Sequence, residues 1–161
     1  ADEFSRTEGG FSRFNFDVNH VSKLSKVTQF DIFAHGQLAN RNLDSSEQFY
    51  LGGADAVRAY PQGEAGGDSG YQATAELRYQ TPVKGMSMTL FADVGEVLAR
   101  KDGDTSDPHR RLAGWGIGAV YSLDRSLYAR LDYARKIKGE SYRSEAEDKN
   151  GRLWFRLYKL F

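Results

Sequence analysis

The sequence predicts an all-β protein whose strands form a transmembrane antiparallel β-barrel. Three observations indicate this fold: apolar and polar residues alternate in strand-length stretches, connections are short and long in turn, and charged side chains lie inside the strands. The 161 residues include 17 Gly, 10 Phe and 9 Tyr but only 3 Pro, which suits strands better than helices. The mean hydropathy of −0.61 is compatible with such a barrel, because only every second residue of a membrane-spanning strand faces lipid.

Alternation with a period of two predicts seven strands, over residues 13–19, 29–38, 71–80, 86–95, 114–121, 127–134 and 152–161. Strands of about ten residues are long enough to cross a bilayer when they are tilted. In chain order, the apolar faces of the strands consist of Phe14, Phe16 and Val18; Phe30, Ile32, Ala34, Gly36 and Leu38; Tyr71, Ala73, Ala75, Leu77 and Tyr79; Met86, Met88, Leu90, Ala92 and Val94; Trp115, Ile117, Ala119 and Tyr121; Leu127, Ala129, Leu131 and Tyr133; and Leu153, Phe155, Leu157 and Phe161.

The predicted connections fall into two classes. Residues 21–26, 81–85 and 122–125 form short connections, whereas residues 40–70, 98–110 and 138–150 form long polar ones. Short turns on one side and long loops on the other are typical of outer-membrane barrels. A soluble up-and-down barrel alternates in the same way, but its packed core could not hold charges such as Glu76, Arg78 and Asp93. Tyr71 and Tyr79 at strand ends also match an aromatic girdle at the membrane surface.

Seven is an odd number of strands, whereas single-chain bacterial barrels have an even number. An open sheet edge is also untenable in lipid, because its backbone groups find no partners there. Residues 1–9 are too few and too polar to supply an eighth span. We therefore expect residues 1–161 to be the C-terminal part of an outer-membrane barrel domain that begins in an extracellular loop.

Composition and motifs argue against several other classes of protein. Lys plus Arg and Asp plus Glu are 22 each, which disfavours a nucleic-acid binder, and the absence of Cys excludes disulfides and thiolate chemistry. The Gly-Asp-Ser-Gly segment at residues 67–70 resembles a protease nucleophile segment but has no matching base. The aspartates of residues 102–107 lack the Glu that a calcium loop needs, and His20, His35 and His109 have no metal-ligand spacing. We expect no enzyme activity, no cofactor and no metal.

Three motifs follow one another along the chain. Residues 51–60 read Leu-Gly-Gly-Ala-Asp-Ala-Val-Arg-Ala-Tyr, residues 91–95 read Phe-Ala-Asp-Val-Gly, and a C-terminal strand ends in Phe161. From Phe11 to Phe161 the chain resembles the C-terminal barrel region of the TpsB transporters of two-partner secretion. Their pattern is Leu-Gly-Gly, three residues and Val-Arg-Gly-Tyr/Phe, then Phe-x-Asp-x-Gly. The sequence departs from it at Ala59, where the family has Gly, and at Lys159, where an apolar residue is usual.

The resemblance implies that these are the last seven strands of a sixteen-stranded barrel in the outer membrane of a Gram-negative cell. It implies a pore component that translocates a large unfolded partner protein, a TpsA-type exoprotein, to the cell surface. The remaining strands and the periplasmic POTRA domains of the family are absent from this sequence. Implied partners are the lipid bilayer and the barrel assembly machinery, which would read the C-terminal signal formed by Leu153, Phe155, Leu157 and Phe161. The alternative is a small structural or adhesion barrel with ligand-binding loops and no transport role.

The resemblance also implies a site inside the barrel. The long loop over residues 40–70 is expected to fold into the lumen and to carry a loop-lock motif there, formed by Val57, Arg58, Ala59 and Tyr60. Strand phase places Asp93 on the lumenal face, and the other expected lumenal partners are Glu76, Phe91 and Gly95. An arginine can pair with a carboxylate through two parallel hydrogen bonds, and partial desolvation strengthens the pair. Gly114, Gly116 and Gly118 would let the loop approach the wall. Of the two interpretations of Arg58, a solvated loop arginine or a lumenal ion pair, the resemblance favours the ion pair.

Overall fold

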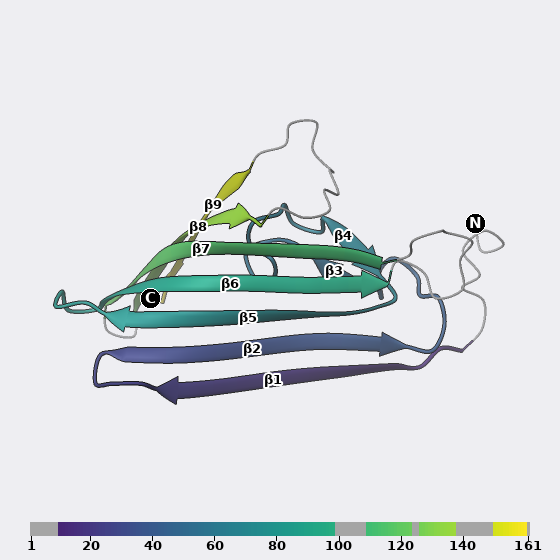
Figure 1. Cartoon of the computed structure of the whole chain (residues 1–161), viewed down its shortest axis with the longest axis horizontal. Helices are drawn as coiled ribbons and strands as arrows, with labels where there is room; N and C mark the ends of the chain where they lie inside the picture. The colour runs from purple at the N-terminus through teal and green to yellow at the C-terminus, as the bar shows by residue number, and fades with distance from the viewer. Residues whose placement is uncertain (1–9, 99–108, 124–125, 138–149, 161) are drawn as a thin grey trace.

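A computed structural model describes residues 10–98, 109–123, 126–137 and 150–160. Seven long strands form one antiparallel sheet in the order β1-β2-β5-β6-β7-β8-β9, as Figure 1 shows, and two short strands pair separately. The strands are β1 (Arg13–Lys23), β2 (Thr28–Ala39), β3 (Phe49–Leu51), β4 (Ala65–Gly67), β5 (Ser69–Gln80), β6 (Met86–Leu98), β7 (His109–Leu123), β8 (Leu127–Lys136) and β9 (Gly151–Lys159). Each of the seven predicted strands is therefore present, and each neighbour in the sheet is also the next long strand in the chain.

Several predicted connections are shorter than expected, because the strands beside them are longer. β1 continues to Lys23, which pairs with Gln29, so the connection predicted over residues 21–26 is confined to residues 24–27. The alternation of apolar residues stops at His20, but the backbone ladder needs no apolar side chain to continue. β5 likewise begins at Ser69, so the long connection runs over residues 40–68 rather than 40–70. The other two long connections lie mostly outside the described residues.

The two faces of the sheet differ in chemistry and in exposure. On one face large apolar side chains are open to the surroundings, and 51% of Leu90 and 64% of Phe155 are exposed. On the other face charged side chains are buried, and Glu76 and Asp93 are only 3% and 1% exposed. Apolar-out and polar-in alternation is the reverse of a soluble protein and is the arrangement of a membrane barrel wall.

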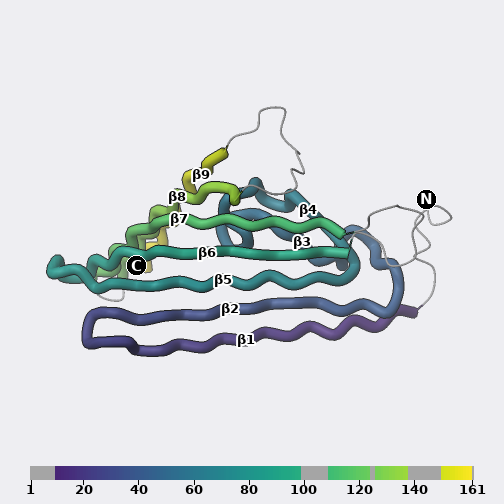
Figure 2. Tube along the Cα trace, viewed as in Figure 1, coloured from purple at the N-terminus to yellow at the C-terminus, as the bar shows by residue number. Residues whose placement is uncertain are grey.

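The buried face is concave and is covered by the connection between β2 and β5. Figure 2 shows the sheet curling towards β9, with β3 and β4 lying behind β6 and β7. The hydrophobic core lies between this connection and the wall. Its members are Phe49, Leu51, Val57, Ala59, Tyr60 and Ala65 from the connection and Phe91, Val97, Leu112 and Ala134 from the strands.

The β3–β4 pair was not expected from the sequence. Each strand has three residues, and the pair joins Phe49 to Gly67 and Leu51 to Ala65. Three residues are too few to show a period of two, and Gly66 and Gly67 carry no side chain to reveal one. The long connection is therefore an ordered hairpin rather than an irregular loop.

The sheet is open. Within the described residues, β1 and β9 each pair with a neighbour on one side only. No helix long and apolar enough to cross a membrane occurs in the described part of the chain. The open edges at β1 and β9 are the places where additional strands could join the sheet.

Candidate functional site

The segment between β3 and β4 forms a compact turn whose tip carries Arg58. The N–H of Gly53 donates to the carbonyl of Tyr60 at 3.1 Å, and the N–H of Tyr60 donates to the carbonyl of Val57 at 3.1 Å. Gly52 and Gly53 have φ angles of 85° and 114°, a region that residues with a side chain rarely adopt. The Leu-Gly-Gly part of the motif therefore makes the bend that directs the Val-Arg-Ala-Tyr part at the wall.

Arg58 from this turn contacts Asp93 of β6 side on. Its Nε donates to Asp93 Oδ2 at 2.9 Å and its Nη2 donates to Asp93 Oδ1 at 2.7 Å. The backbone N–H of Arg58 adds a third hydrogen bond to Oδ2 at 3.1 Å. Thr74 of β5 donates to Oδ1 at 2.9 Å, which fixes the carboxylate from the wall side. Both charged side chains are nearly inaccessible, at 5% and 1% exposure, so water screens the pair little.

Glu76 and Phe91, two other expected partners, complete the surroundings of the guanidinium. Arg58 Nη1 lies 3.4 Å from Glu76 Oε2. The guanidinium carbon lies 3.2 Å from the centre of the Phe91 ring, a stacked cation–π arrangement. Arg58 is thus held by Asp93 and Glu76 at its edge, with Asp132 3.8 Å away, and by an aromatic face beneath it.

Two further cations on the wall bind the carboxylates of the site. Arg130 of β8 donates to Glu76 Oε2 at 2.7 Å and to Asp132 Oδ2 at 2.7 Å, and Arg78 donates to Glu76 Oε1 at 2.9 Å. The sequence places these charges on the lumenal face but gives no sign of which pairs form. Such pairing depends on how far the sheet curls, because Glu76 and Arg130 lie three strands apart in the sheet order.

The last strand also contacts the turn, a contact that the sequence did not predict. Trp154 Nε1 donates to the carbonyl of Arg58 at 2.7 Å, and Arg156 forms an ion pair with Asp55. Both side chains belong to the alternate set of β9 that faces inward, opposite the apolar set. The position of Trp154 on the polar face of β9 could have indicated this contact, because the N–H of a buried Trp usually donates to an acceptor.

Glycines on the wall allow the turn to approach closely. A Cβ at Gly114 would lie 2.6 Å from the Cβ of Ala59, and one at Gly95 would lie 2.6 Å from Cδ2 of Leu51. Real Cβ contacts are almost never this short, so a larger residue at either place would displace the turn. The methyl group of Ala59, where the family has Gly, packs directly against the bare backbone of Gly114.

The remaining expected site residues fall into two groups. Val57 and Tyr60 are buried in the core of the turn, and the Lys136 ammonium lies 4.9 Å from the centre of the Tyr60 ring. Leu153, Phe155 and Leu157, assigned to a C-terminal assembly signal, lie on the exposed apolar face and do not contact the site; Phe161 lies outside the described residues. The part of the chain that the structure describes contains no group of three or more residues able to hold a metal ion.

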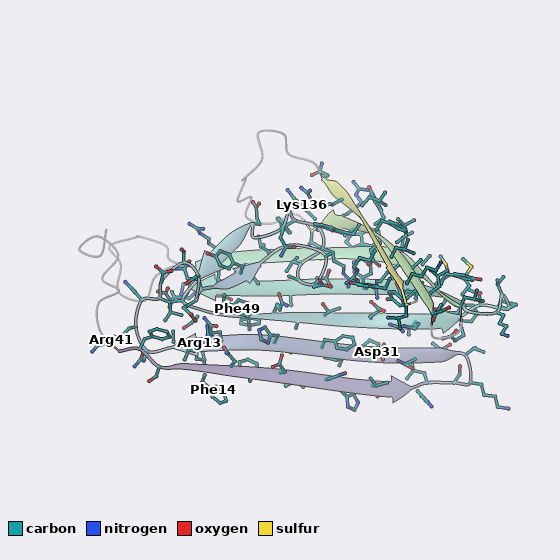
Figure 3. The ribbon with its side chains drawn as sticks, turned by 180° about the vertical axis from the view of Figure 1, so that it is seen from behind. Arg13, Phe14, Asp31, Arg41, Phe49 and Lys136 are labelled. Carbon is teal, nitrogen blue, oxygen red and sulfur yellow. The ribbon has the colours of Figure 1, made fainter. Side chains whose placement is uncertain are left out.

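Figure 3 shows the sheet from behind relative to Figure 1, with Asp31 on β2 and Phe49 on β3 among its labelled side chains. Asp31 is 1% exposed and lies 3.9 Å from Arg78 Nη2. The wall therefore carries four buried carboxylates, Asp31, Glu76, Asp93 and Asp132, which contact the guanidinium groups of Arg58, Arg78, Arg130 and Arg156. The turn contributes Arg58, and the strands contribute the rest.

A protein-family model described as haemolysin secretion/activation protein ShlB/FhaC/HecB matches residues 1–121. The chain belongs to this family. ShlB/FhaC/HecB proteins are the TpsB transporters of two-partner secretion, outer-membrane β-barrels and not enzymes. The resemblance found in the sequence is therefore confirmed.

Sequence comparison with individual proteins finds similar transporters. The heme/hemopexin transporter protein HuxB of Haemophilus influenzae strain 86-028NP is 33% identical over 98 residues, which cover 59% of this chain and 17% of HuxB. HuxB of strain ATCC 51907 is 34% identical over 88 residues, which cover 53% of this chain and 16% of that protein. The chain thus spans about a sixth of the curated relatives it matches.

A solved structure supports the fold. CdiB from Acinetobacter baumannii superposes with a TM-score of 0.66 at 24% identity, over 91% of this chain and 26% of CdiB. The seven-stranded antiparallel sheet therefore matches part of a CdiB barrel, and the predicted fold class is confirmed.

Proposed function

We propose that residues 1–161 form the C-terminal part of an outer-membrane pore that exports a large unfolded partner protein by two-partner secretion. The exposed apolar face of the sheet would contact lipid, and the concave polar face would line the pore. The open edges of β1 and β9 support further strands that close a barrel, because unpaired backbone groups cannot remain in lipid.

The connection over residues 40–68 would be the resting plug of this pore. The observation that carries this proposal is the buried side-on pair between Arg58 and Asp93. Ordering a connection of this length costs conformational entropy at every residue, so a plug needs specific anchors. A guanidinium held by two carboxylates and an aromatic ring is such an anchor, and it can be released without breaking a covalent bond.

The proposed partners follow from the two faces and from the family. An unfolded TpsA-type exoprotein would pass through the polar lumen. Lipid would cover the apolar face, and the barrel assembly machinery would read Leu153, Phe155, Leu157 and Phe161 during insertion. No nucleotide motif occurs in the sequence, so export would draw on folding of the partner outside the cell.

Single-channel conductance of the purified protein in planar bilayers tests this function. Residues 40–68 would be replaced by a short Gly/Ser linker, which fits because Ala39 and Ser69 already lie side by side, with the Ala39 N–H 2.9 Å from Ser69 Oγ. We expect a large, steady conductance from the linker variant and a small or intermittent one from the parent. Equal conductance in both proteins would contradict the plug, and no conductance in either would favour a structural or adhesion barrel.

A further inference from the structure

A second feature of the concave face lies at the end opposite the plug. A cavity of about 340 Å³ opens beside the short connection between β1 and β2. It is lined by Lys23, Ser25, Lys26, Val27, Thr28, Gln29, Arg78 and Gln80. Lys23, Gln29 and Arg78 lie in one row across β1, β2 and β5, on the face that carries Glu76.

The lining of this cavity carries an excess of positive charge. Three of its residues are cationic, and no carboxylate is among them. Arg78 is balanced by Glu76 at 2.9 Å and by Asp31 at 3.9 Å. Neither Lys23 nor Lys26 forms an ion pair with any residue in the described ranges, so two of the three charges have no counter-charge there. Clefts lined by one sign of charge concentrate ligands of the opposite sign.

The hydrogen-bond donors in the lining also favour an anion. Ser25 Oγ accepts hydrogen bonds from the N–H groups of Val27 and Thr28 at 3.2 and 3.0 Å, which leaves its own O–H free to donate. Arg78 Nε is buried and has no hydrogen-bond partner in the structure. The lining of the cavity therefore contains ammonium, guanidinium and hydroxyl donors.

We propose that this cavity binds carboxylate side chains of an acidic polypeptide segment. A lipid is a poor occupant, because Val27 is the single apolar residue in the lining and the cavity opens on the polar face of the sheet. The identity of the segment rests on the proposed function, in which the polypeptide that passes this face is the exported partner. Pairs with exposed lysines are individually weak, so an acidic segment would be held and released reversibly.

Binding of a fluorescent peptide to the full-length protein in detergent tests the site. One peptide carries four consecutive Asp or Glu residues, and the control peptide carries the matching amides. We expect the acidic peptide alone to bind, with an affinity that falls as salt is raised. Lys23→Gln combined with Lys26→Gln should weaken the affinity for the acidic peptide about tenfold. Two exposed ion pairs together contribute on the order of 1.4 kcal/mol, which corresponds to a factor of ten in the dissociation constant.

Two control variants distinguish the effect of the lysine charges in the cavity from other effects of the substitutions. Lys84→Gln removes an exposed lysine of the neighbouring turn that does not line the cavity, and it should leave the affinity unchanged. Lys23→Arg combined with Lys26→Arg should keep the affinity, because the charges stay. Equal binding of both peptides, or no loss in the double Gln variant, would overturn the proposal.

The lipid alternative is tested in the same assay. Displacement of the labelled peptide by detergent-dispersed phosphatidylglycerol at a lower concentration than that of unlabelled acidic peptide would mark a lipid headgroup site and would also overturn the proposal. Because binding is measured at equilibrium without transport, the result is independent of the conductance test of the plug. Equal conductance in the parent and the linker variant, together with intact peptide binding, would remove the plug and leave the anion site.

Discussion

Arg58→Ala removes the side chain that anchors the turn to the wall. The variant loses the two side-chain hydrogen bonds to Asp93, the longer contact to Glu76 and the stack on Phe91, but it keeps the backbone N–H bond to Asp93 Oδ2. Removing one partner of a buried ion pair costs about 3–5 kcal/mol. Water in the lumen can solvate Asp93 once the turn leaves, so we expect the lower end of this range. About 3 kcal/mol lowers the closed-to-open ratio of the plug roughly 150-fold.

The open probability of single channels in planar bilayers measures this ratio directly. Arg156→Ala is the matched control, because it also removes an arginine that contacts the turn, but its partner in the turn, Asp55, is 83% exposed, and its other contact, to Asp132 at 3.7 Å, lies within the wall. Such an exposed pair contributes about 1 kcal/mol or less. If Arg58→Ala raises the open probability no more than Arg156→Ala does, Arg58 is not the anchor of the plug.

A double-mutant cycle isolates the pair from its surroundings. Asp93→Ala leaves Arg58 beside Glu76 at 3.4 Å and Asp132 at 3.8 Å, so this single change should cost less than Arg58→Ala. The double variant should be little worse than Arg58→Ala alone, because residues in direct contact are not additive. Arg58→Lys should restore closure only in part, since an ammonium cannot make two parallel hydrogen bonds. Strict additivity of the two single effects would show that the residues act independently.

Three other changes test the wall. Arg130→Ala leaves its two carboxylate partners buried with less compensation, and it should lower the unfolding free energy by about 3–5 kcal/mol in denaturant titrations of the detergent-solubilised barrel; a loss below about 1 kcal/mol would contradict the buried network. Gly114→Ala places a methyl group against Ala59 and should raise the open probability, whereas Gly10→Ala, with no atom within 4 Å of its new Cβ, should not; equal effects would exclude the close approach. Leu90→Arg puts a charge on the apolar face and should destabilise the folded barrel by about 2–4 kcal/mol in lipid; an unchanged stability would mean that this face does not contact lipid.

The strands were predictable because membrane barrels repeat one simple pattern. Alternation of apolar and polar residues gave the number of strands and the face of each side chain, including Asp93 and Glu76. It could not give the ends of β1 and β5, since backbone pairing continues where side chains stop alternating. It also could not give β3 and β4, whose three residues are shorter than two periods of any pattern.

The site was predictable only where a motif identified it. The approach of Arg58 to Asp93 was expected from a family resemblance together with strand phase. The partners of Arg130 were not, because they depend on the curvature that brings β8 over β5. The contact of Trp154 with the turn depends on the same curvature. A pattern along one strand contains no information about how far the sheet curls.

If the connection over residues 40–68 is the plug, it must leave the wall for export to occur. Asp55→Cys with Arg156→Cys joins this connection to β9, and residues 1–161 contain no other Cys to interfere. A short bifunctional methanethiosulfonate reagent would tether the two thiols, with each single-Cys variant as control. We expect that tethered cells stop secreting the partner protein and resume secretion when the tether is reduced. Undiminished secretion with the tether fully formed would contradict the plug.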